Sequence, residues 1–211
     1  MEGKKIKVLI ADDHPVVREG LAAIVSRETD MTVIAQAGNG QEAIDLFCRH
    51  HPDLALLDLS LPDISGVEVI TFLLPSFPDA RFAVVSVFDG NEDIYRALKA
   101  GAMSYLLKDS SPEELLHAIR ELFAGRRYLP RQIASKLTER IQEDYLTPRE
   151  QDVVHLMSDG KSNRQIADDL HLSEGTVKTH VTNILEKLKV TSRSHAVVEA
   201  LRRGIVHSRK Q

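Results

Sequence analysis

Five short apolar runs alternate with five amphipathic stretches in the first 125 residues of this chain. The runs are β-branched or aliphatic, as strands buried on both faces usually are; they cover 5–11, 32–37, 54–58, 82–87 and 104–108. The stretches between them have the spacing of amphipathic helices and cover 15–28, 40–50, 65–74, 91–101 and 111–125. This order predicts a five-stranded, doubly wound parallel sheet with right-handed helical crossovers.

After Gly125 the strand pattern stops and only helical patterns follow. Residues 126–144 are expected to form a basic linker with one short helix, and residues 145–211 a separate helical domain. Its helices are predicted at 148–158, 163–170, 174–188 and 193–203. Residues 1–125 hold 11 Lys and Arg against 20 Asp and Glu, a balance of −9, whereas the rest hold 16 against 11, a balance of +5. Two domains with different partners are therefore expected, the basic one with nucleic acid.

Composition excludes several other classes of protein. No run approaches the ~18 apolar residues that a membrane helix needs, and the N-terminus lacks the cleavage site of a signal peptide. A single cysteine, Cys48, cannot form an internal disulfide, and its apolar-periodic surroundings indicate a packing or surface role. We therefore expect a cytoplasmic protein that does not bind membranes.

Charged residues follow three of the predicted strands. Asp12 and Asp13 end the first strand, Asp58 ends the third and Lys108 ends the fifth. The carboxyl ends of parallel strands share one edge of a sheet, where such folds bind ligands. Crowded carboxylates require a cation, and oxygen ligands favour Mg²⁺. The combination suits phosphoryl transfer to a carboxylate, although each acid alone is more often a helix cap. His14 beside the acids is interpreted as a surface residue.

A second pattern points elsewhere but is rejected. The segment "GNGQEA" at 38–43 matches the glycine spacing of a dinucleotide-binding turn. It follows the second strand, however, and Asp12 and Asp13 after the first strand would repel a pyrophosphate. A tight turn between strand and helix is the better interpretation.

The motifs "ADDHP", "LLDLSLPDISG", "VVSV" and "KAGAMSYLLKD" occur in the order found in one protein family. Residues 5–125 resemble the receiver domain of bacterial two-component response regulators, which has a flavodoxin-like fold. The resemblance implies that Asp58 accepts a phosphoryl group from a phosphohistidine on a sensor histidine kinase, and that Lys108 pairs with it. It also implies a switch hydroxyl at Ser86 and a switch aromatic at Tyr105.

The same resemblance implies a set of Mg²⁺ ligands. Asp13, Asp58 and the main-chain carbonyl of Ser60 would bind the ion directly, and Asp12 through water. Two positions depart from many receivers. Asp109 follows Lys108 where a cis proline is common, so no cis bond is expected. Phe88 occupies a position that helps to set the rate of self-dephosphorylation in the family and is often polar there, which leaves the phosphoryl lifetime open.

The helical half contains the pattern of a helix-turn-helix. Thr147 and Glu150 can form a capping box, and Ser162 and Ser173 can cap the next two helices. In the last of these helices the apolar positions keep helical spacing and face a core. Four polar residues lie off that face and could meet phosphates and base edges: Lys178, Thr179, Thr182 and Asn183.

The motifs "LTPREQDVV", "GKSNRQIADDL", "LSEGTVKTHVTNILEKL" and "TSRSHAV" are similar to the LuxR-type effector domain of NarL/FixJ regulators. By position, Lys178, Thr179 and Thr182 would face the DNA groove. Thr182 replaces a lysine of some relatives, which predicts fewer phosphate contacts. The helix at 194–204 matches the family's dimer contact on DNA, and two-fold operators are expected from it.

Together these features predict a transcription factor, not an enzyme, whose receiver promotes its own Mg²⁺-dependent phosphorylation and dephosphorylation. Phosphorylation at Asp58 would control homodimerisation and binding to double-stranded promoter DNA, with RNA polymerase as a further candidate partner. Two alternatives remain open at this point. A Mg²⁺-dependent phosphohydrolase would carry an acid two residues after its nucleophile, where this chain has Ser60. A quorum sensor would use Trp in its ligand pocket, and the chain contains none.

Overall fold

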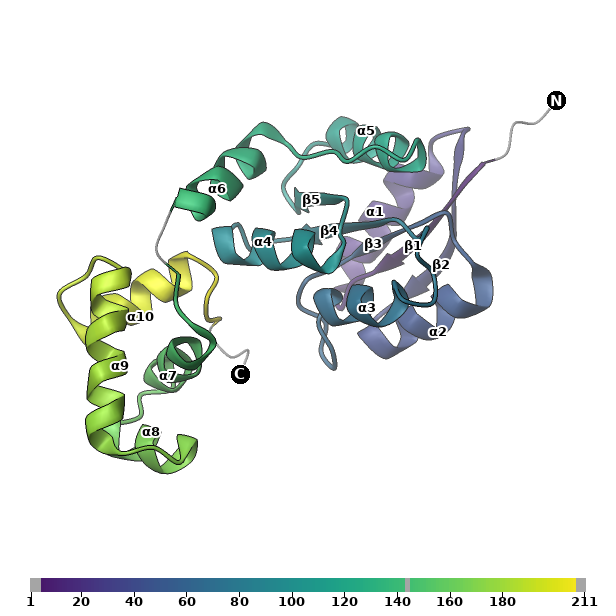
Figure 1. Ribbon diagram of the computed structural model, residues 1–211. Coiled ribbons are helices and arrows are strands. Elements are labelled where there is room, and N and C mark those ends of the chain that lie inside the picture. Colours follow the sequence, from purple (N-terminus) through teal and green to yellow (C-terminus); the bar gives the residue numbers. More distant parts are fainter. Residues whose placement is uncertain (1–4, 143–144, 208–211) are drawn as a thin grey trace. The chain divides into compact units, whose positions relative to one another are not determined.

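The computed structural model describes residues 5–142 and 145–207 (Figure 1). The chain divides into two compact units, one of residues 1–88 and 94–135 and the other of residues 89–93 and 136–211. Each unit has its own hydrophobic core. The domain boundaries expected at residues 125 and 145 stay a prediction.

The first unit is built on a five-stranded, all-parallel sheet in the order β2-β1-β3-β4-β5. The strands are β1 (Ile6–Ala11), β2 (Met31–Ala37), β3 (Leu54–Leu57), β4 (Phe82–Ser86) and β5 (Ser104–Leu107). The helices between and after them are α1 (Pro15–Ser26), α2 (Gly40–His50), α3 (Gly66–Leu73), α4 (Asn91–Ala100) and α5 (Pro112–Phe123). The predicted flavodoxin-like fold is therefore confirmed.

Helices cover both faces of the sheet, as a fully buried parallel sheet requires. α1 and α5 pack with β1 on one face, where Val25 and Ile119 join Val8 and Ile10 in a single apolar cluster (Figure 1). On the other face the Phe47 ring of α2 stacks on the Phe82 ring of β4, with the two centroids 5.5 Å apart. The sheet is held rigidly from both sides, so the residues that follow its strands have fixed positions.

The turn after β3 is held by a glycine. A Cβ atom at Gly66 would lie 2.3 Å from the carbonyl oxygen of Asp58, closer than any side chain can approach. Ser65 caps α3 in a capping box with Glu68, which fixes where that helix begins. The backbone of Asp58 is therefore clamped between β3 and the start of α3.

The segment "GNGQEA" is a tight turn, as expected. A Cβ atom at Gly40 would lie 2.4 Å from the side chain of Ile64, so only glycine fits there. Asp63 accepts hydrogen bonds from the backbone N–H groups of Gly40 at 2.7 Å and Gln41 at 2.9 Å. It therefore satisfies free donors at the start of α2 and connects the turn after β3 to the turn after β2.

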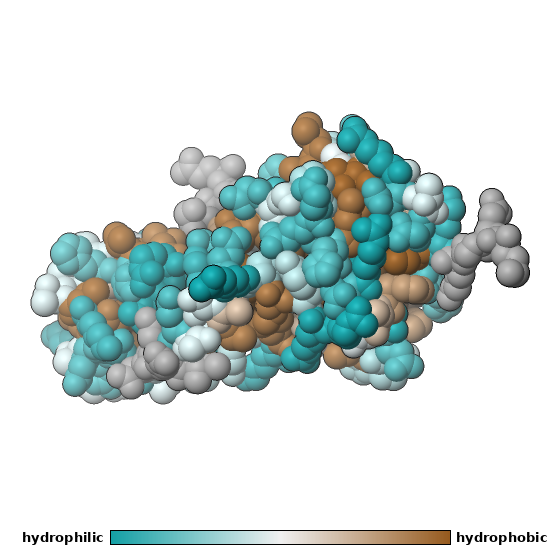
Figure 2. All heavy atoms as spheres, turned by 90° about the horizontal axis from the view of Figure 1, so that it is seen from above, coloured by the Kyte–Doolittle hydropathy of each residue, from teal (hydrophilic) through white to brown (hydrophobic). Residues whose placement is uncertain are grey.

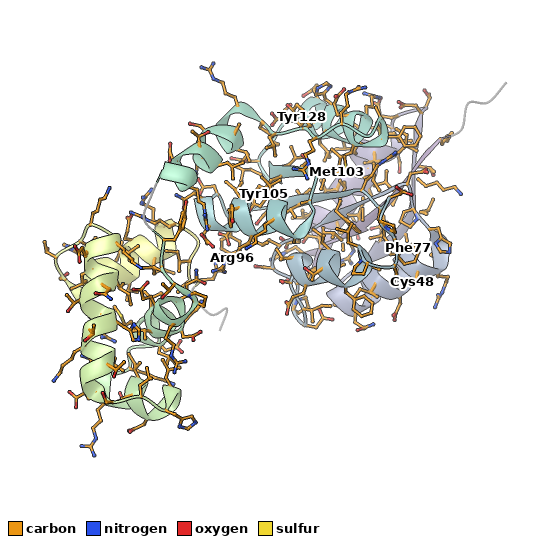
Figure 3. All side chains as sticks on the ribbon, in the orientation of Figure 1. Cys48, Phe77, Arg96, Met103, Tyr105 and Tyr128 are labelled. Carbon is orange, nitrogen blue, oxygen red and sulfur yellow. The ribbon has the colours of Figure 1, made fainter. Side chains whose placement is uncertain are left out.

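The chain after α5 first runs beside β5. The N–H of Tyr128 donates to the carbonyl of Met103 at 3.1 Å, and its ring meets His117 edge-on with the centroids 4.9 Å apart (Figure 3). The helix predicted in the linker then follows as α6 (Arg131–Gln142). Cys48 on α2 is exposed, which agrees with a surface role (Figure 3).

The second unit contains α7 (Pro148–Ser158), α8 (Asn163–Leu170), α9 (Glu174–Lys187) and α10 (Arg193–Arg202). Thr147 and Ser162 form capping boxes with Glu150 and Gln165, and Ser173 caps α9, so the predicted starts of these helices are confirmed. The core joins apolar residues of all four helices: Val153, Val154, Ile166, Val177, Ile184, Ala196 and Ala200.

Lys187 at the end of α9 is not simply solvated. Its Nζ lies 2.7 Å from Oε2 of Glu150, a carboxylate that is only 3% exposed. The same Oε2 accepts from the N–H of Thr147. One buried carboxylate therefore caps α7 and pins α9 to it.

Hydrophilic side chains cover much of the face seen in Figure 2, with hydrophobic groups scattered among them. None of the helices in the described ranges is long and apolar enough to cross a membrane.

Candidate functional site

Three strands end at the edge of the sheet where the sequence places its charged residues. The register pairs Ala11 of β1 with Leu57 of β3, so Asp12 and Asp58 are the next residues on neighbouring strands. The N–H of Asp58 donates to the carbonyl of Ala11 at 2.8 Å. Both side chains are almost inaccessible to water, with Asp12 1% and Asp58 3% exposed. Two carboxylates are thus forced together in a poorly hydrated place.

Lys108 closes this pocket from the end of β5. Its Nζ lies 2.6 Å from Oδ2 of Asp12 and 2.9 Å from Oδ2 of Asp58. Burial alone would lower the pKa of Lys108, but hydrogen bonds to the two carboxylates outweigh it and raise that pKa. Lys108 is therefore a fixed positive charge at neutral pH.

The pKa of Asp58 is raised above its ordinary value. Burial is the largest cause, and the hydrogen bond from Lys108 offsets it only in part, while the nearby charge of Asp12 adds to it. Ionisation of Asp58 therefore costs free energy in the folded protein. A cation or a phosphoryl group added to the pocket would change that cost.

The pocket has the donors that a metal ion needs. Asp12, Asp13, His14 and Asp58 each offer one ligand atom, and these four atoms lie within 4.8 Å of one another. His14 is exposed, as its interpretation as a surface residue predicts. Its Nδ1 also lies 2.6 Å from Oδ1 of Asp13, a contact that the sequence did not indicate. A metal ion fits this set of donors.

The turn after β3 contributes backbone groups. The N–H of Ser60 is 3.3 Å from Oδ1 of Asp58, which orients that carboxylate. No peptide bond among the described residues is cis, in line with Asp109 replacing proline after Lys108.

Ser86 on β4 and Tyr105 on β5 are both fully buried, and the register places Tyr105 opposite Val84, two residues before Ser86. The Oγ of Ser86 accepts from the N–H of Phe88 at 3.1 Å. The hydroxyl of Tyr105, whose side chain is labelled in Figure 3, donates to the carbonyl of Phe88 at 2.7 Å. The backbone of Phe88 therefore links the two side chains. The sequence showed both residues but not this link, which depends on how the chain turns after β4.

The polar face of α9 differs from this pocket. Lys178, Thr179 and Thr182 are exposed, and Asn183 is half-buried. The hydroxyls of Thr179 and Thr182 donate to carbonyls one turn earlier, at 3.2 and 3.1 Å. Lys178 pairs with Glu174 at 3.0 Å. In the free protein the side chains of Lys178, Thr179 and Thr182 therefore bond to groups of α9 itself and stay accessible to solvent.

The fold and the acidic pocket of the first unit are those of a receiver, and the second unit is a helix-turn-helix. Residues 8–120 match the family model of the response regulator receiver domain, and residues 144–200 match that of bacterial regulatory proteins of the luxR family. The chain therefore belongs to the NarL/FixJ family of two-component response regulators, which are DNA-binding transcription regulators. The receiver match excludes the phosphohydrolase and the quorum sensor as descriptions of the first unit.

Individual relatives agree along nearly the whole chain. The uncharacterized transcriptional regulatory protein YxjL of Bacillus subtilis is 38% identical over 98% of this chain and 100% of its own length. The nitrate/nitrite response regulator protein NarL of Escherichia coli is 39% identical over 90% of this chain and 93% of its own. The crystal structure of the response regulator ChrA, from a heme-sensing two-component system, has a TM-score of 0.59 and 34% identity, covering 97% of this chain and 100% of that one.

Proposed function

We propose that Asp58 is the phospho-acceptor of this regulator and that a sensor histidine kinase supplies the phosphoryl group. The observation that carries the proposal is the buried Asp58 carboxylate at the end of β3 with Nζ of Lys108 2.9 Å away. A carboxylate oxygen of Asp58 attacks the phosphorus of the phosphohistidine. The new P–O bond forms as the P–N bond breaks, and the imidazole keeps the electron pair.

Mg²⁺ fits the oxygen donors of this pocket. Asp13, Asp58 and the main-chain carbonyl of Ser60 would hold it, with Asp12 acting through water. Bound there, the ion screens the negative charge of the transferring phosphoryl group. Lys108 then neutralises a phosphoryl oxygen, for which its raised pKa keeps it fully charged.

The phosphoryl group would act on the pair that shares the backbone of Phe88. The hydroxyl of Ser86 turns and donates a hydrogen bond to a phosphoryl oxygen. This movement breaks the hydrogen bond that the N–H of Phe88 donates to Oγ of Ser86 in the unphosphorylated protein. Tyr105 follows, because its hydroxyl is bound to the same residue. The surface around α4 and β5 changes, and the population shifts toward a state that dimerises and binds DNA.

The output lies on the second unit. Lys178, Thr179, Thr182 and Asn183 of α9 meet the phosphates and base edges of the major groove. α10 supplies the dimer contact, which is supported by two apolar side chains three residues apart on its surface, Val198 at 63% and Leu201 at 40% exposed. A homodimer reads two-fold promoter sites, with RNA polymerase as a further partner.

Phosphorylation from a small donor tests the acceptor. Wild-type protein incubated with labelled acetyl phosphate and Mg²⁺ is expected to take up label, and Asp58→Asn to take up none. Asp79→Asn, which removes an exposed aspartate from the loop before β4, is the matched control and keeps wild-type labelling. Full labelling of Asp58→Asn would show that another residue is the acceptor.

Selection of DNA sequences tests the output. A fluoride complex that mimics the phosphoryl group, added with Mg²⁺, is expected to enrich two-fold sites that the untreated protein does not enrich. If the same sites were enriched with and without the fluoride complex, DNA binding would not depend on phosphorylation of Asp58.

A further inference from the structure

His14 stands in the metal-binding pocket although the phosphoryl chemistry does not require it. Its ring is held at the mouth of the pocket, because the N–H of His14 donates to Oδ1 of Asp12 at 2.8 Å and α1 begins at the next residue, Pro15. The side chain is 53% exposed, so an ion arriving from solvent can reach it.

The distances suit two ligands of one ion. Nδ1 of His14 lies 2.6 Å from Oδ1 of Asp13 and 3.4 Å from Oδ1 of Asp12. Ligand atoms at right angles on an ion with bonds of about 2.1 Å are separated by about 3 Å. The two distances lie on either side of this value. The imidazole nitrogen is in direct contact with Asp13 and is close enough to both carboxylate oxygens to share an ion with them after small movements of the side chains.

We propose that His14 is a metal ligand and that the pocket accepts a first-row transition ion, such as Co²⁺, through its imidazole. The proposal rests on the metal site of the proposed function and adds to it a nitrogen ligand from this chain. Mg²⁺ takes oxygen ligands and gains little from imidazole, whereas Co²⁺ and its later neighbours bind nitrogen well. His14 thus sets which ion the receiver prefers, and a transition ion can occupy the site in place of Mg²⁺.

A purely structural role for His14 makes a different prediction. If His14 only donates a hydrogen bond to Asp13, it orients one carboxylate for every ion alike. Glutamine retains an N–H donor but has no imidazole nitrogen. His14→Gln therefore separates ligation from orientation.

The test compares Co²⁺ and Mg²⁺ binding to the full-length chain by calorimetry at neutral pH. His14→Gln is expected to weaken Co²⁺ binding about tenfold and Mg²⁺ binding less than about twofold. Proton NMR of the Co²⁺ form supplies an independent signature, a strongly shifted exchangeable imidazole N–H that disappears in His14→Gln. His50→Ala, at an exposed histidine on α2, keeps both the affinity and this signal.

Two results would overturn the proposal. Equal losses of Co²⁺ and Mg²⁺ affinity in His14→Gln, or a shifted imidazole signal that survives in this variant, would leave His14 outside the ligand set. These outcomes leave the phospho-acceptor function standing if wild-type protein still binds Mg²⁺ and takes label at Asp58. Absence of both ions from the wild-type pocket would remove the metal site and this inference together.

Discussion

The acidic pocket of the receiver and the polar face of α9, the two sites to which we assign function by proposal, are built in opposite ways. In the pocket, Asp58 and Lys108 are withdrawn from water and held against each other at 2.9 Å. On α9, Lys178 and Thr182 are exposed and bound only to their own helix. A site that reacts must be desolvated and fixed before its substrate arrives, because electrostatic interactions are strong only there. A site that binds DNA must keep its groups accessible.

The two units also place their carboxylates differently. Burial raises the pKa of Asp58 in the receiver. In the helical unit, burial would raise the pKa of Glu150, but hydrogen bonds from Lys187 and Thr147 together with the charge of Lys187 outweigh it, and the pKa is lowered. Hydrogen bonds from Arg202 and Arg203 lower the pKa of Glu199 to about 2. The receiver therefore holds a costly carboxylate at the position that we propose is phosphorylated, whereas the carboxylates of the helical unit are ionised at little cost and stabilise it.

The largest effect is expected at Glu150. Glu150→Ala removes the acceptor for the N–H of Thr147 and leaves Lys187 without this buried partner, and it should destabilise the helical unit by about 2 kcal/mol. Hydrogen exchange of amides in α7 and α9 measures this locally. Glu174→Ala removes an exposed ion pair as the control and should change stability by less than about 0.5 kcal/mol. If both variants lost the same stability, the buried ion pair of Glu150 would contribute no more than the exposed pair of Glu174.

A smaller effect is expected on the affinity for DNA when Lys178 is replaced. Lys178→Ala should weaken binding to a selected site about tenfold and reduce the salt dependence of log K by about one phosphate contact, since it removes a charge from the side of α9 that we propose faces the DNA groove. Fluorescence anisotropy over a range of salt concentrations measures both. Lys7→Ala removes an exposed lysine from β1 of the receiver and should leave both unchanged. An equal loss in Lys7→Ala would point to nonspecific charge instead of a defined face.

The smallest effect tests the contrast in pKa. Asp58→Asn should raise the free energy of unfolding of the receiver at neutral pH by on the order of 1 kcal/mol, because the ionised wild-type carboxylate is penalised by burial. The gain should shrink as pH falls through the raised pKa of Asp58 and vanish below its unfolded value of 3.8. Hydrogen exchange of β3 amides measures it, and Asp109→Asn, at an exposed site, is the control.

Over the same fall in pH the helical unit should lose stability. The lowered pKa of Glu199 stabilises the fold above 4.5, and this contribution disappears as pH falls toward about 2. Amides of α10 report it. The two units would then respond in opposite directions to acid, and a parallel response would contradict the contrast between their carboxylates.

Local signals were enough to predict the elements of both units. The helix caps at Thr147, Ser162 and Ser173 form as expected, because a cap involves only residues within three positions. The alternation of strands and helices likewise led to the right sheet, since few topologies satisfy it. Contacts between distant segments were missed. Asp63 binds the start of α2 from 22 and 23 residues away, and Lys187 meets Glu150 across 37 residues.

The sequence by itself determined the fold class, the order of the elements and which acids end which strands. Only the tertiary structure decided what those acids do to one another. The register of β1 against β3 sets Asp12 beside Asp58, the length of β5 brings Lys108 to both, and the start of α1 turns His14 toward Asp13. These distances of less than 3 Å between side chains depend on packing across the whole sheet, whereas periodicity and capping depend on near neighbours along the chain.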